Sequence, residues 1–320
     1  MSKDSILVIG AAGQIGTELT QALREAHGNS NVVAADVREP EFGVKESGPF
    51  ENLDVLDTKQ LAEVCSNHGI PVIYPLAALL SASAEKDPVF GWELNMGGLL
   101  NVLDLAVERK ISKIFWPSSI AVFGPGTPRQ KTPQSTVTDP GTVYGITKLA
   151  GERWVEYYWQ KHGLDIRSLR YPGLISYGTP PGGGTTDYAV DIFHKAINRA
   201  DFTCFLKEDC RIPMMYMPDA IRGTLQLMDA EKSSVKIRSS YNFAAISFTP
   251  AEIADAIKKH YPDFKVAYRP DFRQKIADTW PESIDDTPAR EDWGWAHRYD
   301  LDAMTSDMLA NLQVFKSAGL

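Results

Sequence analysis

The sequence predicts an α/β fold in which a doubly wound parallel sheet is followed by a smaller α/β region. Two observations support this prediction. Short apolar runs alternate with segments of helical length and periodicity between residues 6 and 171, which is the pattern of a parallel sheet covered on both faces. After residue 175 the alternation becomes irregular, so we expect a first domain over 1–175 and a second over 176–320, some segments of which can return to the first sheet.

The first strand and the turn that ends it give the strongest local signal. Residues 6–9 are apolar throughout and read as a strand buried on both faces, and three glycines follow at a regular spacing. Gly10 allows a sharp turn, Gly13 leaves room for a pyrophosphate, and Gly16 lets the next helix approach the strand. This is a Rossmann dinucleotide-binding turn, whose helix start offers free amides to the anion. The contacts predicted here are Gly10, Gly13, Gln14, Ile15 and Gly16.

An acid follows the second apolar run. Val32-Val-Ala-Ala35 ends in Asp36, twenty residues after Gly16, where such units place a carboxylate that accepts hydrogen bonds from the adenosine ribose. That carboxylate would repel a 2′-phosphate, which favours NAD over NADP as the cofactor. The neighbouring Arg38 keeps NADP open as an alternative.

The third unit places more candidate contacts at the edge of the sheet. Asp57 and Gln60 have the spacing of a capping pair that opens a helix over 58–68, and a short strand follows at 71–74. The loop before this helix is placed to bracket an adenine ring, with a solvated turn as the alternative. The residues after the strand lie where open parallel sheets bind ligands. The predicted cofactor contacts are Asp54, Val55, Leu76, Ala77 and Ala78.

Two further elements complete the predicted cofactor site. Residues 88–110 read as one long helix whose polar exception, Asn95, either braces the backbone of the site or lies on the surface. The strand over 165–171 ends at Tyr171, and the loop after it would pass near the nicotinamide. Asn95 and Tyr171 are therefore also expected at the cofactor.

Three side chains form a constellation for alcohol oxidation. Ser119 follows a strand at 113–116, and a helix over 142–162 carries Tyr144 and Lys148 four residues apart on one face. Tyr144 is the expected base, and its pKa, ordinarily about 10, would have to fall toward neutrality beside Lys148 and an oxidised cofactor. Ser119 would hold the substrate oxygen, and Lys148 would also reach the nicotinamide ribose. A solvated Tyr-Lys pair is the alternative.

The order of these motifs resembles the extended short-chain dehydrogenase/reductase family, which includes nucleotide-sugar epimerases and dehydratases. Within it, the chain is similar nearly from end to end to the zinc-independent L-threonine 3-dehydrogenases. The segments that carry this similarity are Leu79-Leu-Ser-Ala-Ser-Ala-Glu-Lys86, Trp116-Pro-Ser-Ser-Ile-Ala-Val-Phe-Gly-Pro125, Gly182-Gly-Gly-Thr-Thr-Asp-Tyr188 and Tyr268-Arg-Pro-Asp-Phe-Arg-Gln-Lys-Ile-Ala-Asp-Thr-Trp-Pro281. Pro75 departs from the family pattern and removes a backbone donor beside the cofactor.

The resemblance implies oxidation of L-threonine by NAD to 2-amino-3-oxobutyrate. It also implies that Trp280 closes over the substrate and that Ser119 and Tyr144 contact it. A glycine-rich loop before a helix can seat a carboxylate, although Thr185, Thr186 or Asp187 can instead cap that helix. The further substrate contacts expected are Ser81, Gly184 and Thr185.

Two other functions stay open from the sequence. The first alternative is a nucleotide-sugar 4-epimerase or dehydratase, in which a cluster of arginines would clamp a diphosphate. The second is a non-catalytic NAD sensor, which would not need the Tyr-Lys pair. The arginines concerned are Arg211, Arg222, Arg269 and Arg273.

The composition of the chain limits the classes of molecule that it is expected to bind. The 320 residues carry a formal net charge of -8, which argues against nucleic acid, and no apolar run is long enough for a membrane span. Three scattered cysteines and six histidines predict neither a disulfide framework nor a metal site. With no visible signal peptide, a cytoplasmic location is expected. The helices over 88–110 and 142–162 have enough apolar residues to pair with a second subunit, as the resemblance implies, so a homodimer is expected, with burial of these residues within one chain as the alternative.

Overall fold

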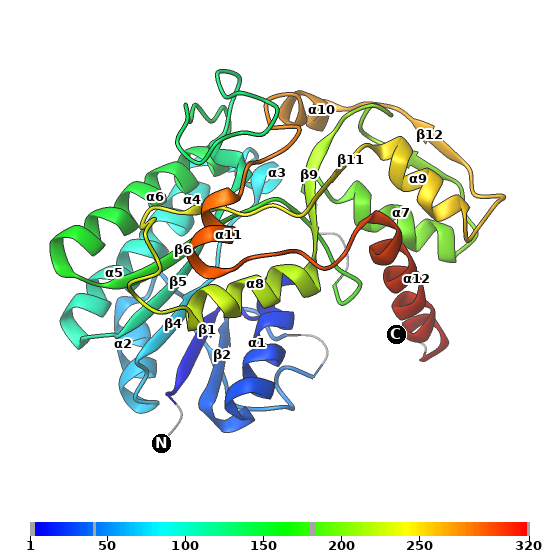
Figure 1. Ribbon diagram of the computed structural model, residues 1–320. Helices are drawn as coiled ribbons and strands as arrows, with labels where there is room; N and C mark the ends of the chain where they lie inside the picture. Colours follow the sequence, from blue (N-terminus) through cyan, green and yellow to red (C-terminus); the bar gives the residue numbers. More distant parts are fainter. Residues whose placement is uncertain (1–3, 41–42, 180–183, 319–320) are drawn as a thin grey trace.

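The computed structural model describes residues 4–40, 43–179 and 184–318, and its central feature is a parallel sheet (Figure 1). Seven strands in the described residues form this sheet, in the order β10-β6-β5-β4-β1-β2-β3, and every neighbouring pair is parallel. The predicted doubly wound parallel sheet is therefore confirmed. The strands are β1 (Ile6–Ile9), β2 (Val32–Asp36), β3 (Phe50–Asn52), β4 (Val72–Pro75), β5 (Lys113–Ser119), β6 (Asp165–Tyr171) and β10 (Tyr241–Asn242).

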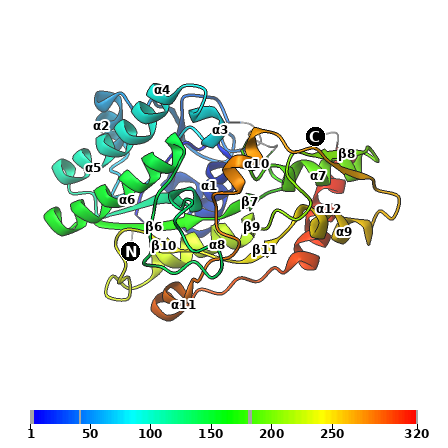
Figure 2. The same cartoon turned by 90° about the horizontal axis from the view of Figure 1, so that it is seen from above.

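Helices cover both faces because successive strand residues point to opposite sides. Leu7 and Ile9 of β1 pack with α2 (Thr58–Asn67), α5 (Gly98–Arg109) and α6 (Val143–His162). Ile6 and Val8 pack on the other face, against α1 (Gln14–His27) and α8 (Met217–Asp229). Figure 2, seen from above, shows α5 and α6 on one side of β6 and α8 on the other. Both β10 and α8 come from beyond residue 175, so the second half of the chain helps to build the first core.

The remaining elements form a smaller α/β region with its own core. One small sheet has the order β11-β9-β7, with β9 antiparallel to β11 and parallel to β7, and a second pairs β12 with β8 in parallel. Figure 1 shows the helices of this region gathered beside the large sheet. Its elements are β7 (Gly173–Ile175), α7 (Tyr188–Ile197), β8 (Phe202–Cys204), β9 (Ile212–Tyr216), β11 (Ile246–Phe248), α9 (Pro250–Lys258), β12 (Val266–Tyr268), α10 (Phe272–Ala277) and α12 (Leu301–Ala318). α11 (Thr287–Trp293) lies against β10.

Two expectations about local structure need correction. The predicted single helix over 88–110 is instead a succession of three elements: α4 (Pro88–Trp92), a π-helical turn η2 (Glu93–Gly97) and α5. The wider π-helical turn contains Asn95, whose side chain points inward and accepts a hydrogen bond from the backbone amide of Leu79. The predicted capping pair of Asp57 and Gln60 at the start of α2 forms only one of its two expected interactions. Asp57 accepts hydrogen bonds from the helix, but the Gln60 amide bonds to the backbone of Asp54 and Asn52 instead.

Other predicted ends are close to the observed ones. The strand expected at 113–116 runs on to Ser119, and β3 was not predicted because it is short and half exposed. The short elements not yet named are η1 (Asn29–Asn31), α3 (Ser81–Ala84) and η3 (Ile120–Val122). Residues 182 and 183 of the predicted glycine-rich loop lie outside the described residues.

Candidate active site

The glycine-rich turn is a cradle closed on one side. Gly10 has a φ of 86°, and a Cβ there would lie 2.6 Å from the amide nitrogen of Ala77. A Cβ at Gly16 would lie 2.1 Å from the carbonyl oxygen of Gly10, so α1 packs directly on the turn. At Gly13, by contrast, the nearest described heavy atom to a Cβ is the Gly10 carbonyl oxygen, at 3.3 Å. The turn is packed below Gly10 and Gly16 and roomier at Gly13.

The start of α1 suits an anion. Its N-cap residue is Gly13, so no side chain caps the first backbone amides of the helix. The first turn also contains no acidic residue. The positive end of the helix dipole is therefore not neutralised from within its own first turn, where Gln14 and Ile15 are half-buried. These residues fit the diphosphate of a dinucleotide.

Asp36 lies next to this cradle at the end of β2. Its side chain is buried, and its two carboxylate oxygens accept hydrogen bonds from the backbone amides of Ala12 and Arg38, both at 3.0 Å. The Arg38 side chain is exposed, with its Nε 3.6 Å from the carboxylate. Each carboxylate oxygen keeps a lone pair for another donor, as a ribose hydroxyl would require.

The other predicted cofactor residues divide into exposed backbone and buried side chains. Leu76, Ala77 and Ala78 follow β4 as a half-buried, irregular segment beside Gly10. Asp54 is exposed and accepts a hydrogen bond from the amide of Leu56 at 2.9 Å. The Val55 side chain is part of the core under α5, which leaves its backbone for any ligand contact.

Pro75 is accommodated without a break in the sheet. It is the last residue of β4 and lies opposite Ile9 of β1. The next residue restores the ladder, because the amide of Leu76 donates to the carbonyl of Ile9 at 2.8 Å. The missing donor at residue 75 therefore does not disturb the pairing beside the glycine turn.

Asn95 and Tyr171 act mainly on the protein itself. The Asn95 amide accepts from the Leu79 amide at 2.8 Å and donates to the Leu79 carbonyl and to the Thr147 hydroxyl, both at 3.1 Å. Asn95 therefore braces the backbone at Leu79, which was one of the two roles that the sequence left open for it. Tyr171 is buried, and its hydroxyl is bonded to Thr224 of α8, so only its backbone remains for a cofactor contact.

The three predicted catalytic side chains come together between β5 and α6. Tyr144 lies one turn into α6, where Thr142 caps the helix. Its hydroxyl is close enough to the Ser119 side chain, at the end of β5, for that side chain to lower its pKa. The Lys148 ammonium lies 5.5 Å from the centroid of the Tyr144 ring and donates to the carbonyl of Pro117 at 2.6 Å. The end of β5 and the start of α6 thus bring Ser119, Tyr144 and Lys148 together.

We expected Lys148 and an oxidised cofactor together to lower the pKa of Tyr144, and the structure gives the effect of the protein groups alone. Burial raises the pKa of Tyr144 to about 12, against the opposing effect of the Ser119 side chain. Burial also lowers the pKa of Lys148 to about 7. The Lys148 ammonium bonds to a carbonyl and not to the phenol, so it does not outweigh desolvation. A phenolate at this position needs further positive charge nearby.

A buried ion pair behind these residues was not predicted. Glu152 is fully buried one turn after Lys148, and its carboxylate receives two hydrogen bonds from Arg170 of β6, at 2.8 and 2.7 Å. The Ser118 hydroxyl donates to the same carboxylate at 2.6 Å. The signal in the sequence was an acid on the helical face shared with Tyr144, together with an arginine inside an apolar strand, since buried charges require partners.

Two of the expected substrate residues, Ser81 and Trp280, lie in parts of the fold that also contact α6 or Tyr144. Ser81 is buried in α3, whose C-terminal neighbour Glu85 accepts a hydrogen bond from the amide of Val143 at 2.7 Å and so ties α3 to the start of α6. Trp280 is buried in the core of the smaller region, against which the Tyr144 ring also packs. These contacts connect α3 to the start of α6, and the Tyr144 ring to the core that contains Trp280.

The glycine-rich loop leaves one buried hydroxyl unsatisfied. The Gly184 amide donates to the Asp187 carboxylate at 2.8 Å, so this acid holds the loop and does not cap α7 with its side chain. The Thr185 hydroxyl is buried and has no hydrogen-bond partner among the described residues. Such a group is expected to meet a ligand or water.

Comparisons with known proteins identify the family of the chain. The model of the family described as "NAD dependent epimerase/dehydratase family" matches residues 6–244. An uncharacterized epimerase/dehydratase from Staphylococcus saprophyticus is 49% identical over 306 residues, which is 95% of each chain.

Solved structures are similar over nearly the whole chain. A partial consensus L-threonine 3-dehydrogenase has a TM-score of 0.95 and 57% identity, covering 97% of this chain and 99% of its own. The holo form of a GalE-like L-threonine dehydrogenase from Cupriavidus necator has a TM-score of 0.94 and 56% identity, covering 96% and 99%. A monomeric L-threonine 3-dehydrogenase from a metagenome database has a TM-score of 0.93 and 47% identity, covering 97% and 99%.

Proposed function

The chain belongs to the NAD dependent epimerase/dehydratase family, and from this premise we propose that it oxidises the 3-hydroxyl of L-threonine with NAD to 2-amino-3-oxobutyrate. Its predicted resemblance to extended short-chain dehydrogenases/reductases is confirmed, and it is an enzyme of this family. The observation that carries the proposal is the similarity to L-threonine 3-dehydrogenase structures over nearly the full chain, at up to 57% identity.

In this proposal Tyr144 is the general base. It takes the hydroxyl proton of the substrate while Ser119 donates a hydrogen bond to the same oxygen and fixes its position. The hydride leaves the carbon that bears this hydroxyl, so a ketone is formed. An oxidised nicotinamide, when bound, would be the hydride acceptor and would supply the positive charge that favours the phenolate. Lys148, held by the Pro117 carbonyl, provides a second cation whose charge grows as the pH falls through about 7.

The cofactor proposed is NAD, held by the glycine cradle, the start of α1 and Asp36. The substrate proposed is the small amino acid, with Ser81, Gly184 and Trp280 around it. The unpartnered Thr185 hydroxyl supports a polar contact at this position.

The test is the appearance of NADH at 340 nm when the enzyme is mixed with NAD⁺ and L-threonine. We expect turnover with L-threonine and none with a UDP-sugar. Binding or conversion of the UDP-sugar, with no NADH from threonine, would show that the epimerase alternative is correct.

The structure gives a reason to prefer a small substrate to a nucleotide sugar. Three of the four arginines that were candidates for clamping a diphosphate are paired with carboxylates of the protein. Their ion pairs are Arg211 with Glu252 at 2.5 Å, Arg222 with Asp219 at 2.7 Å, and Arg273 with Asp271 at 2.6 Å. A diphosphate would have to displace these acids, so the arrangement does not favour a clamp.

Replacing Asp36 by asparagine is expected to weaken NAD binding about tenfold, because a charged acceptor for the ribose is lost. Discrimination against NADP should fall as well, since the exposed Arg38 is then free of its acidic neighbour. Dissociation constants of both cofactors check this. Asp201→Asn, at an exposed position, is the matched control. An unchanged ratio of the two constants would exclude Asp36 as the selecting group.

We also propose a homodimer formed through the outer surface of α5 and α6. Val107, Ile146, Trp154 and Tyr157 are exposed there, and association would cover them. The metagenome neighbour is described as monomeric, so the mass of the protein in solution decides between the two states. No helix in the described ranges is long and apolar enough to cross a membrane. The cytoplasmic location remains a prediction.

A further inference from the structure

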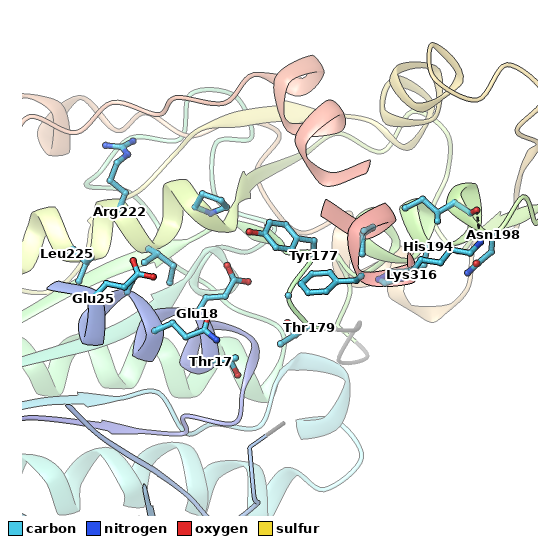
Figure 3. A pocket seen from close by; sticks show the side chains of 18 residues that line it. Thr17, Glu18, Glu25, Tyr177, Thr179, His194, Asn198, Arg222, Leu225 and Lys316 are labelled. Atoms are coloured by element: carbon cyan, nitrogen blue, oxygen red, sulfur yellow. Dashed lines mark hydrogen bonds between the residues drawn. The ribbon is translucent and has the colours of Figure 1, made fainter. Parts of the chain in front are cut away.

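A second cavity lies between the two regions of the molecule, on the α1 side of the large sheet. Figure 3 shows its walls, to which α1 and α8 contribute from one region and α7 and α12 from the other. Its volume is about 850 Å³. Small-molecule sites commonly occupy ~300–1,000 Å³, so the cavity is large enough for an organic ligand.

This cavity is separate from the proposed active site. None of the described residues that line it belongs to the predicted cofactor or catalytic set, so Gly10, Asp36, Tyr144 and Lys148 are all absent from its walls. α1 contributes to both places. Its first residues face the glycine cradle, whereas Thr17 and the residues that follow along the helix line the cavity.

α1 gives the cavity an acidic wall. Glu18, Gln21 and Glu25 are spaced by one helical turn and share one face of this helix. The Glu18 carboxyl group accepts a hydrogen bond from the Ser176 hydroxyl, and burial raises the pKa of Glu18 to about 7. No lysine or arginine of the described chain forms an ion pair with it. The cavity therefore contains a half-buried carboxyl group without a cationic partner in the described chain, and this group is ionised above a pH of about 7.

The opposite wall is largely apolar, and its cations are already engaged. Arg222 is paired with Asp219, and Figure 3 shows its guanidinium pointing away from Glu18. Lys316 donates to the carbonyl of Ile197 at 3.2 Å. The apolar lining residues are Ala22, Ile197, Ile221, Leu225, Leu312 and Phe315.

Two polar atoms in the cavity wall could also form hydrogen bonds with a ligand. The Thr179 hydroxyl and Nε2 of His194 are buried and have no hydrogen-bond partner among the described residues. Buried polar atoms are normally satisfied, and a ligand with polar hydrogens would satisfy these. Burial lowers the pKa of His194, so its ring is neutral and does not repel a cation.

We propose that this cavity binds a small primary amine with an apolar body. The ammonium group pairs with Glu18, and the apolar body lies against α8 and α12. Charge complementarity at the α1 wall selects this class over an anion, because Glu18 and Glu25 form no ion pair within the described chain, whereas Lys316 lies at the Ile197 carbonyl, beside Asn198 and away from Glu18 (Figure 3). Since the ligand would touch both regions of the chain, it is expected to stabilise their association.

The experiment is isothermal titration calorimetry of the full chain at pH 8 with three probes of equal length: n-hexylamine, 1-hexanol and hexanoate. Hexylammonium should bind about tenfold or more tightly than 1-hexanol, and hexanoate should not bind detectably. Saturating NAD⁺ should leave hexylammonium binding intact. Equal affinities for amine and alcohol, tighter binding of hexanoate, or competition with NAD⁺ would each overturn the proposal.

Two variants test the residues that carry it. Glu18→Gln keeps an acceptor for Ser176 but removes the charge, and should weaken hexylammonium binding about tenfold or more without affecting 1-hexanol. Glu63→Gln, an exposed change on α2, is the matched control. Leu225→Trp fills the cavity and should abolish binding of both probes, which keeps the test decisive if the Glu18 variant fails to fold. Unchanged binding in either folded cavity variant would exclude this site.

Discussion

Tyr144→Phe is expected to lower kcat by about 10²–10⁴-fold, because it removes the hydroxyl proposed to take the substrate proton. The ring remains packed against the core of the smaller region, and Lys148 keeps its bond to the Pro117 carbonyl. NAD should therefore still bind. Steady-state kinetics with L-threonine, together with the dissociation constant of NAD, measure both effects.

Tyr157→Phe is the control for this change. It alters the same residue type on the same helix, at a position outside the proposed active site that is 49% exposed in the single chain; the ring is kept, so the proposed dimer surface keeps its apolar group. It should leave kcat unchanged. Full activity of the Tyr144 variant would show that the base is another group, and loss of NAD binding would show that the change damaged the cofactor cradle.

Glu152→Ala is expected to lower the free energy of unfolding by about 3–5 kcal/mol, because it leaves a buried guanidinium without its partner. Glu152 is fully buried, and Arg170 bonds to both of its oxygens. The same carboxylate accepts a hydrogen bond from the hydroxyl of Ser118, the residue before Ser119. Turnover should fall as well, since this network joins α6, β5 and β6 behind the proposed catalytic groups. Urea unfolding measures the first effect and kcat the second.

A neighbouring glutamate on the same helix is the control. Glu156 pairs with Arg153 at 3.0 Å on the surface, and Glu156→Ala should cost no more than about 1 kcal/mol. If the two variants were equally stable, the buried pair would not hold these elements together. If Glu152→Ala were destabilised yet fully active, its role would be in stability alone.

Local patterns were enough to predict most of the first domain. Runs of apolar residues and glycines at a fixed spacing depend on the nearest few residues of the chain. Elements that depend on distant partners were predicted less well. The strand β3 and the π-helical turn at Asn95 are decided by contacts with other segments.

The sequence by itself determined the family, the parallel sheet and the candidate chemistry, because the glycine turn and the Tyr-Lys spacing are set along the chain. Only the tertiary structure decided the environment of these groups. Burial raises the pKa of Tyr144, Arg170 reaches Glu152 from another strand, and α1 meets α8 around an acidic cavity. The physical reason is that desolvation and ion pairing depend on which residues meet in space, and spacing along the chain does not report that.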